Sequence, residues 1–150
     1  MKIGVPKEIK PQENRIGLTP DSVKTLTSNG HEVLVENDGG FEAGFDNNQY
    51  KSAGAKIIDK AEDIFNDAEI IVKVKEPLSN EVKMLRENQI VFTYLHLAAA
   101  KELTKGLVDS KAVCIAYETV TDNNGRLPLL APMSAVAGRM SVQAGAHCLE

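Results

Sequence analysis

Short apolar runs of strand length alternate along this chain with amphipathic stretches whose apolar residues recur at helical spacing. The apolar runs predict strands at residues 2–5, 31–36, 55–58, 69–76, 89–96 and 111–119. The amphipathic stretches predict helices at residues 19–29, 46–54, 59–67, 79–87, 100–110 and from 131 onward. Because strands separated by single helices need crossover connections, this order predicts an α/β, Rossmann-like doubly wound domain whose largely parallel sheet has helices on both faces.

Helix-boundary signals agree with several of these elements. Thr19 is a suitable N-cap, Pro20 fits the first turn, and Gly30 stands where that helix must stop. Ser79 is a suitable cap for the helix expected at 79–87. The last helical pattern is still running at Glu150 and shows no stop signal. We therefore expect this chain to be the front part of a longer protein.

Composition narrows the class of protein. A chain of 150 residues with 43% hydrophobic and 25% charged residues has the composition and length of one globular domain. The formal net charge is −4 and no basic cluster is interleaved with aromatic residues, so we expect neither nucleic acid nor an anionic membrane as a partner. No apolar run is long enough for a signal peptide or a membrane span, and we expect a cytoplasmic location.

The cysteines and histidines show no spacing typical of a metal site. Cys114 and Cys148 fit neither a disulfide framework nor a ligand pair, and Cys114 is expected to be a buried, inert thiol in its strand. His31, His96 and His147 form no H-x-x-x-H pair, so no metal is expected. No stretch matches G-x-G-x-x-G, and the dinucleotide fingerprint is therefore absent from these residues.

Polar side chains stand at the carboxyl ends of three successive predicted strands. These are Lys75, His96 and Glu118, and strand alternation places Tyr94 on the same face as His96. Open parallel sheets bind ligands at the carboxyl edge, because the crossover loops diverge there and leave a crevice. The residues alone leave two explanations open: a ligand-binding cluster, or solvated side chains of the kind that any parallel sheet sends to this edge.

Arg15 is a further candidate, because it lies in the long connection between the first predicted strand and the first predicted helix. Connections of this length in a compact domain are often functional, and an arginine fork is suited to bidentate binding of a carboxylate. An ordinary surface arginine is the alternative that the sequence leaves open.

Five segments together resemble the amino-terminal portion of the alanine dehydrogenase family, and they extend over the whole chain. The segments are "IGVPKEIKPQENRIGLTP", "VKVKEP", "TYLHLA", "CIAYETV" and "LPLLAPMSAVAGRMSVQAGA". The wider family includes the nucleotide-binding subunit of proton-translocating transhydrogenase and the lysine-forming saccharopine dehydrogenases, but the combination of "VKVKEP" with "TYLHLA" favours the alanine dehydrogenases. Ala135 stands where many relatives have a glutamate, which puts an interdomain or rim contact in question.

The resemblance implies the reversible oxidative deamination of L-alanine to pyruvate and ammonium with NAD, by a homohexameric enzyme. It implies that Arg15 holds the substrate carboxylate, that Lys75 donates a hydrogen bond to the carboxylate or to the oxygen at C2, and that His96 is the general acid and base. The chemistry agrees with these roles. A cationic donor polarises the C=O or C=N bond, and histidine titrates near neutrality without tuning.

The resemblance also implies supporting roles and a domain organisation. Glu118 would orient Lys75, Tyr94 would line the substrate pocket, and Met133 would pack near both the substrate and the nicotinamide. Residues 1–130 would form the first segment of the substrate domain, and residues 131–150 would begin the helix that leads to an NAD-binding domain outside this chain. By itself, the chain is then expected to be inactive.

Two other functions stay open at this stage. A stand-alone binding or regulatory module for small carboxylates would keep the carboxylate pocket without hydride transfer, and the missing glycine fingerprint motivates it. The related transhydrogenase subunit is the second alternative. A reading frame that continues into a strand and a G-x-G-x-x-G turn would favour the dehydrogenase.

Overall fold

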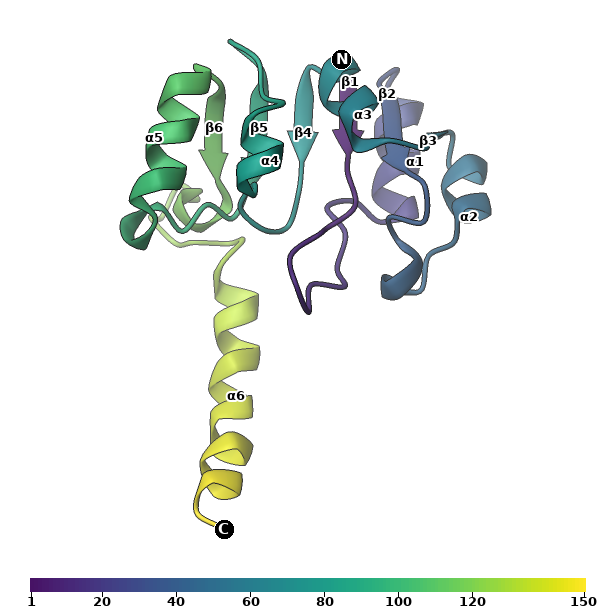
Figure 1. Ribbon diagram of the computed structural model, residues 1–150. Coiled ribbons are helices and arrows are strands. Elements are labelled where there is room, and N and C mark those ends of the chain that lie inside the picture. Colours follow the sequence, from purple (N-terminus) through teal and green to yellow (C-terminus); the bar gives the residue numbers. More distant parts are fainter. The chain divides into compact units, whose positions relative to one another are not determined.

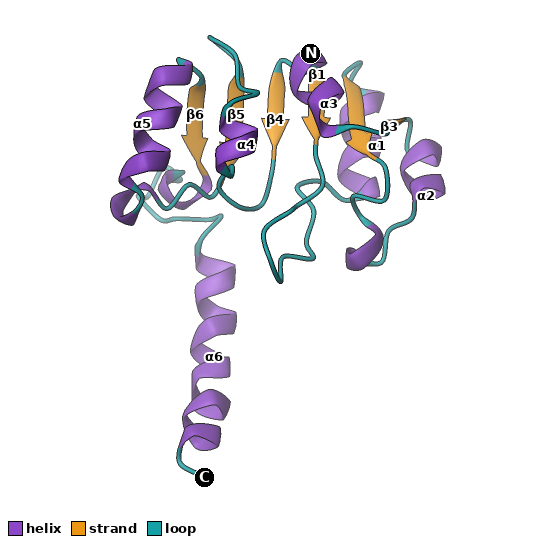
Figure 2. Cartoon of the chain, viewed as in Figure 1, coloured by secondary structure: helices purple, strands orange, loops and turns teal.

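A six-stranded sheet forms the centre of the protein, which a computed structural model describes over residues 1–150. Its strand order is β3-β2-β1-β4-β5-β6, and the strands run in the same direction (Figures 1 and 2). The strands are β1 Lys2–Val5, β2 Glu32–Glu36, β3 Lys56–Ile58, β4 Ile70–Val72, β5 Ile90–Thr93 and β6 Val113–Ala116. The prediction of a doubly wound parallel sheet is confirmed.

Single helices connect successive strands and cover both faces of the sheet. Helix α3 packs on β1 and β2 from the face that also carries α4 and α5, while α1 lies behind β2 in Figure 1. The helices are α1 Pro20–Ser28, α2 Asn47–Ser52, α3 Ala61–Asp67, α4 Ser79–Val82, α5 Lys101–Ser110 and α6 Ala131–Cys148. Short 3₁₀ turns occur at η1 Phe41–Ala43, η2 Leu97–Ala99 and η3 Tyr117–Thr119.

Local sequence explains where the amino-terminal helices begin and end. The Thr19 hydroxyl accepts a hydrogen bond from the Ser22 amide at the start of α1, as the capping signal predicts. Asp46 and Gln49 form a reciprocal capping box at the start of α2. The core beside these helices consists of fully buried valines and Tyr50, whose hydroxyl donates to the Leu18 carbonyl.

The strand order creates a topological switch point between β1 and β4. From β1 the chain proceeds to β2 on one side, whereas β4, β5 and β6 follow one another on the other side. The connections after β1 and β4 therefore diverge at the carboxyl edge of the sheet, which is where ligands bind in open sheets of this kind. Arg15 and Lys75 are carried by these two connections.

Three predicted strands and one predicted helix extend too far. Strand β4 ends at Val72, β5 at Thr93 and β6 at Ala116. Lys75 therefore lies in a bend, His96 in the irregular segment before η2, and Glu118 in a 3₁₀ turn. Helix α4 ends at Val82, because i→i+3 hydrogen bonds follow it and bring Leu85 into the core. Its N-cap is Leu78, so the assignment of Ser79 as the cap is wrong by one residue.

The chain divides into two compact units, Met1–Ile115 and Ala116–Glu150. The second unit contains α6, which begins at Ala131 as predicted and is exposed along its length. No helix of the protein has both the length and the apolar character needed to cross a membrane. The assignment of residues 1–130 to a substrate domain stays a prediction.

Candidate active site

Four of the six predicted site residues lie in the first unit at the carboxyl edge of the sheet. Arg15 is in the connection after β1, Lys75 follows β4, and Tyr94 and His96 follow β5. The parallel register explains their proximity, since Ile71 pairs with Val91 and Val72 with Phe92. Beyond the paired strands, the Tyr94 amide still donates to the Val74 carbonyl at 3.3 Å.

A glycine lets the connection after β1 approach the end of β4. A Cβ atom on Gly17 would lie 2.6 Å from the Val72 carbonyl oxygen and 2.9 Å from its carbon, so only glycine fits without a shift of backbone. This close approach fixes the loop over the switch point. Arg15 precedes Gly17 by two positions and is therefore held near the end of β4.

The Arg15 guanidinium is oriented by Glu13. Its Nε donates to Glu13 Oε1 at 2.8 Å and its Nη2 to Oε2 at 2.7 Å, which is a bidentate pair. These hydrogen bonds lower the pKa of the Glu13 carboxyl from 4.5 to about 2, and Lys75 adds a smaller effect of the same sign. The pairing also raises the pKa of Arg15. Glu13 therefore stays ionised at neutral pH and fixes one edge of the fork, while the arginine side chain is 49% exposed.

Lys75 is held through its backbone on both sides. Its amide donates to Glu8 Oε1 at 3.2 Å, and its carbonyl accepts a hydrogen bond from the Thr93 hydroxyl at 2.9 Å. Glu8 belongs to the connection after β1, whereas Thr93 is the last residue of β5. The lysine thus receives support from both neighbouring strand ends while its own side chain is only partly buried.

A buried cluster of three charged residues lies next to this position. Lys73 Nζ donates to Glu81 Oε1 at 2.7 Å and to Glu8 Oε2 at 3.2 Å, and these side chains are no more than 3% exposed. Glu8, Lys73 and Glu81 are not among the site residues predicted from the sequence. The sequence feature that indicates this cluster is the alternation in "VKVKEP". It places Lys73 inside the sheet, where a lysine needs a carboxylate partner.

Tyr94 and His96 form the part of the edge that β5 contributes. Tyr94 is 6% exposed and stacks on the His96 ring, with centroids 6.3 Å apart and planes at 24°. His96 itself is exposed and lies three residues beyond the end of β5, where its left-handed backbone (φ 51°) turns the chain into η2. The stacked rings agree with the predicted placement of Tyr94 and His96 on one face, although both residues lie beyond the strand.

A second ion pair adjoins His96 on the loop after β4. Glu76 pairs with Lys10 from the connection after β1. Burial acts to raise the pKa of Glu76, but the hydrogen bond from Lys10 and smaller contributions, among them the charge of His96, bring the net value below 4.5. The pair is a further link between the two loops at the switch point.

The other two predicted site residues belong to the second unit. Glu118 lies in η3, immediately after β6, and not at the end of the strand as predicted. Met133 is the third residue of α6 and is 37% exposed. Cys114 is only partly buried, and this burial raises the pKa of its thiol, in keeping with an inert cysteine.

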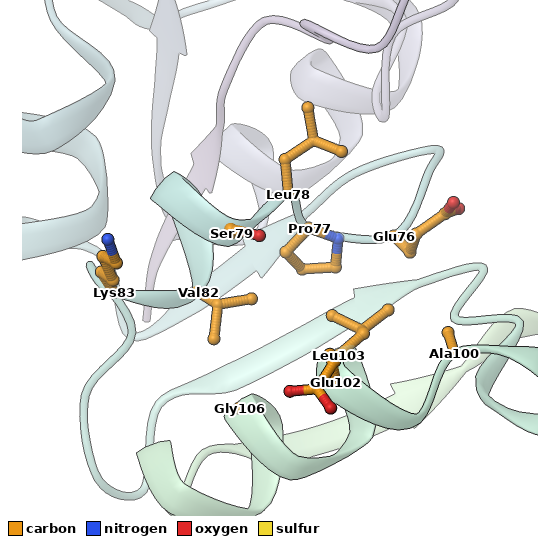
Figure 3. Close-up of a pocket in the computed structure, with 10 residues that line it drawn as sticks. All are labelled: Glu76, Pro77, Leu78, Ser79, Val82, Lys83, Ala100, Glu102, Leu103 and Gly106. Atoms are coloured by element: carbon orange, nitrogen blue, oxygen red, sulfur yellow. The ribbon is translucent and has the colours of Figure 1, made fainter.

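A cavity of about 460 Å³ lies beside this edge, between α4 and α5 (Figure 3). Its lining is mostly apolar and includes Pro77, Val82 and Leu103. Glu76 also lines it, but the carboxylate is turned away from Val82 and Leu103. The cavity is therefore distinct from the polar cluster around Arg15 and Lys75.

Comparison with known proteins identifies the family. The family model described as "Alanine dehydrogenase/PNT, N-terminal domain" matches residues 4–137. The chain belongs to this family. The alanine dehydrogenase of Halomonas elongata is 56% identical over 150 residues, which are all of this chain and 40% of that protein. The chain thus spans about 40% of the length of the curated relatives that it matches.

Solved structures separate the branches of the alanine dehydrogenase/PNT family. An L-alanine dehydrogenase is 53% identical and superposes with a TM-score of 0.92, covering 98% of this chain and 40% of its own. A transhydrogenase from Sinorhizobium meliloti is 26% identical with a TM-score of 0.77, covering 83% of this chain and 35% of its own. Among these relatives, the chain is more similar to the alanine dehydrogenases.

Proposed function

We propose that this chain is the substrate-binding part of an NAD-dependent alanine dehydrogenase, which interconverts L-alanine with pyruvate and ammonium. The observation that carries the proposal is the placement of Arg15, Lys75 and His96 in the connections that follow β1, β4 and β5, three neighbouring strands at the carboxyl edge of the sheet. Conversion of a small 2-oxo acid requires an arginine fork that pairs with its carboxylate and a second cation that polarises the bond at C2. It also requires a side chain that gives and takes a proton.

Arg15 binds the substrate carboxylate in this proposal. Glu13 occupies the Nε–Nη2 edge of the guanidinium and sets the plane of the fork. The planar group is thereby held in a fixed orientation, which reduces the entropy lost when it binds a carboxylate. The half-exposed position of Arg15 agrees with a group that meets a ligand from solvent.

Lys75 and His96 divide the chemistry at C2. Lys75 donates a hydrogen bond to the oxygen or carboxylate and stabilises the negative charge that develops when the C=O bond is polarised. His96 gives and takes the proton as water adds to C2 and leaves, because imidazole is a side-chain group suited to general acid–base catalysis. Its exposed position permits exchange of that proton with solvent.

Tyr94, Glu118 and Met133 have supporting roles in the proposal. Tyr94 lines the substrate pocket and limits the movement of the His96 ring through stacking. Glu118 orients Lys75, and Met133 supplies an apolar wall near the substrate and the nicotinamide. The last two assignments rest on the family resemblance of "CIAYETV" and "APMSAVAGRM".

The residues of this chain do not fit the dinucleotide itself. A pyrophosphate site needs a tight glycine-rich turn between β1 and the next helix, whereas residues 6–18 here form a long connection that carries Arg15. We therefore propose that NAD, which takes up the hydride from alanine, binds to a further domain of the complete protein. In the same proposal residues 1–130 belong to the substrate domain, 131–150 begin the interdomain helix, and the complete enzyme is a cytoplasmic homohexamer.

The test is NADH oxidation with pyruvate and ammonium, measured in parallel for the complete protein and for the 150-residue chain. Activity in the complete protein alone supports the proposal and assigns the cofactor site to the residues beyond this chain. A folded complete protein that is inactive with pyruvate, and also with other 2-oxo acids, overturns it.

The absence of the fingerprint from this chain also favours a second candidate, a module that binds small carboxylates without turnover. Titration of the isolated chain with pyruvate separates the two candidates. Saturable binding, together with an inactive complete protein, supports the second candidate.

A further inference from the structure

The buried cluster of Glu8, Lys73 and Glu81 lies beneath the bend that carries Lys75. Removing charges from water is unfavourable unless each is paired and hydrogen-bonded, so stability alone is a weak reason for such a cluster. Each partner here makes a further contact with the backbone. Glu81 Oε2 accepts from the Leu78 amide at 2.8 Å, while Glu8 Oε1 accepts from the amides of Val74 and Lys75.

We propose that Glu8 is a positioning residue for Lys75 and acts through the backbone amide without touching the substrate. The inference rests on the proposed function, since it assumes that Lys75 meets pyruvate. It gives a role in the site to a buried carboxylate that does not itself bind the ligand.

The backbone hydrogen bonds between β4 and β5 end at the residue before Lys75. The Lys75 amide therefore needs an acceptor from a side chain. The Lys73 amide donates to the Phe92 carbonyl, and the Val74 carbonyl accepts from Tyr94, but β4 itself stops at Val72. The Lys75 amide points instead to Glu8 at 3.2 Å. Glu8 thus supplies the hydrogen-bond acceptor that a neighbouring strand would otherwise offer to the amides of Val74 and Lys75.

The carboxylate of Glu8 is itself held in one orientation. Oε1 accepts from two amides, at 2.6 Å from Val74 and 3.2 Å from Lys75, while Oε2 accepts from Lys73 Nζ. Because Glu8 follows β1 in the same connection as Arg15, it ties the two cationic groups of the site to one another. A shift of about 1 Å at a reacting group is enough to lower turnover markedly.

The experiment compares three substitutions of Glu8 in the complete protein. Glu8→Ala removes both amide contacts, and the KM for pyruvate is expected to rise about 10-fold or more while the KM for NADH changes less than about 2-fold. Glu8→Gln keeps an oxygen that accepts from the two amides, and its pyruvate KM is expected to stay within about 3-fold of the wild-type value. If Glu8→Ala does not fold, Glu8→Asp keeps the charge beside Lys73 but withdraws the oxygen from the amides, with an expected rise of about 3-fold.

A double substitution shows whether the effect passes through Lys75. In a Lys75→Met background, Glu8→Ala is expected to change kcat/KM for pyruvate by less than about 2-fold, because coupled residues are not additive. Gln89→Ala is the control for stability alone. Gln89 is 3% exposed and binds the Phe65 and Ala68 carbonyls at the amino-terminal edge of the sheet, so its loss lowers the Tm without changing the pyruvate KM.

Two results overturn the inference and leave the proposed function intact. One is a folded Glu8→Ala or Glu8→Asp protein with the wild-type KM for pyruvate. The other is an effect of Glu8→Ala that is undiminished in the Lys75→Met background. A folded wild-type protein that is inactive with pyruvate and ammonium, and also with other 2-oxo acids, overturns the proposed function, and the role of Glu8 with it.

Discussion

At the scale of single residues, the proposed site depends on three side chains whose proposed roles have separate signatures. His96 is exposed and stacked on Tyr94, which leaves its ring accessible to protons from solvent. Arg15 is oriented by a carboxylate, and Lys75 is fixed through its backbone. Substitution of each therefore affects a different kinetic quantity.

His96→Ala in the complete protein is expected to lower kcat by about 10²-fold or more, because a positioned acid and base contributes at least that much. Steady-state rates with pyruvate and ammonium measure the effect. His31→Ala is the matched control, since His31 precedes β2 at the amino-terminal edge of the sheet. A wild-type kcat in the His96 variant would remove this ring from the acid–base role.

Arg15→Lys is expected to weaken pyruvate binding by about 10-fold and to change kcat less, because a point charge cannot reproduce a bidentate fork. The KM for pyruvate and a binding titration both report on it. Arg86→Lys serves as the comparison, since Arg86 binds the Phe65 and Ala68 carbonyls on the far edge. Equal pyruvate affinity in wild type and Arg15→Lys contradicts the assignment.

Glu13 gives the site a stability component that depends on pH. Its pKa is about 2 in the folded protein and 4.5 in the reference state, so the contribution is fully present above pH 4.5 and is lost as the pH falls toward 2. In Glu13→Gln this component is missing. Urea unfolding of both proteins at pH 6 and at about pH 3 is expected to show a smaller difference in free energy at the lower pH, and a constant difference speaks against the pairing.

Sequence patterns identified Arg15, Lys75 and His96 as candidate site residues because each stands alone at the end of an apolar run or in a long connection. The patterns did not identify Glu8 and Glu13, which look like ordinary surface carboxylates in "PKEIKPQENR". Glu8 matters because the fold brings Lys73, Val74 and Lys75 against it over a sequence separation of 65 to 67 residues, and contacts of that range leave no local pattern. Glu13 pairs with Arg15 only two residues away, but the bidentate geometry of that pair depends on how the loop folds.

At the scale of elements, hydrophobic alternation located the strands correctly but overestimated the length of three of them. The pattern in residues 2–5 agrees with β1 because this strand is followed at once by Pro6, which restricts the chain. Beyond β4 the alternation "VKVK" continues, yet the chain bends because one side chain from another loop, that of Glu8, accepts hydrogen bonds from two of its amides. Tertiary contacts of this kind decide where a strand ends.

The close approach of the connection after β1 to the end of β4 can be tested by substituting Gly17. Gly17→Ala would place a methyl group 2.6 Å from the Val72 carbonyl oxygen, and backbone on both sides must move. We expect a loss of about 1–3 kcal/mol in the free energy of unfolding, as for other overpacked positions. Because Arg15 moves with the loop, the pyruvate KM is also expected to rise.

The control for this substitution is Gly138→Ala in α6. A Cβ atom there meets nothing within 4 Å, and alanine favours a helix over glycine by up to about 1 kcal/mol. Gly138→Ala is therefore expected to leave stability unchanged or slightly higher. If Gly17→Ala is as stable as wild type, the loop does not need the close approach that the structure shows.

At the scale of the whole chain, the two compact units differ in what stabilises them. The first unit has a parallel sheet with helices on both faces and a core of fully buried valines, Ile64, Phe65 and Tyr50. The second consists of the segment 116–150, whose helix α6 buries no residue. A helix without a buried face gains little from tertiary packing. The first unit is therefore expected to be the more stable of the two in the isolated chain.

Limited proteolysis of the 150-residue chain tests this difference. Trypsin is expected to cut first in the second unit, at Arg126 or Arg139, because both are exposed and cleavage requires a locally open backbone. Mass spectrometry identifies the cut, and the resistant fragment should retain residues 1–115 and unfold cooperatively. Early cuts inside that range would instead show that the sheet does not hold together without the rest of the protein. In the complete protein we expect the same bonds to be protected, since the proposed interdomain position of α6 would bury the face that is exposed in the chain alone.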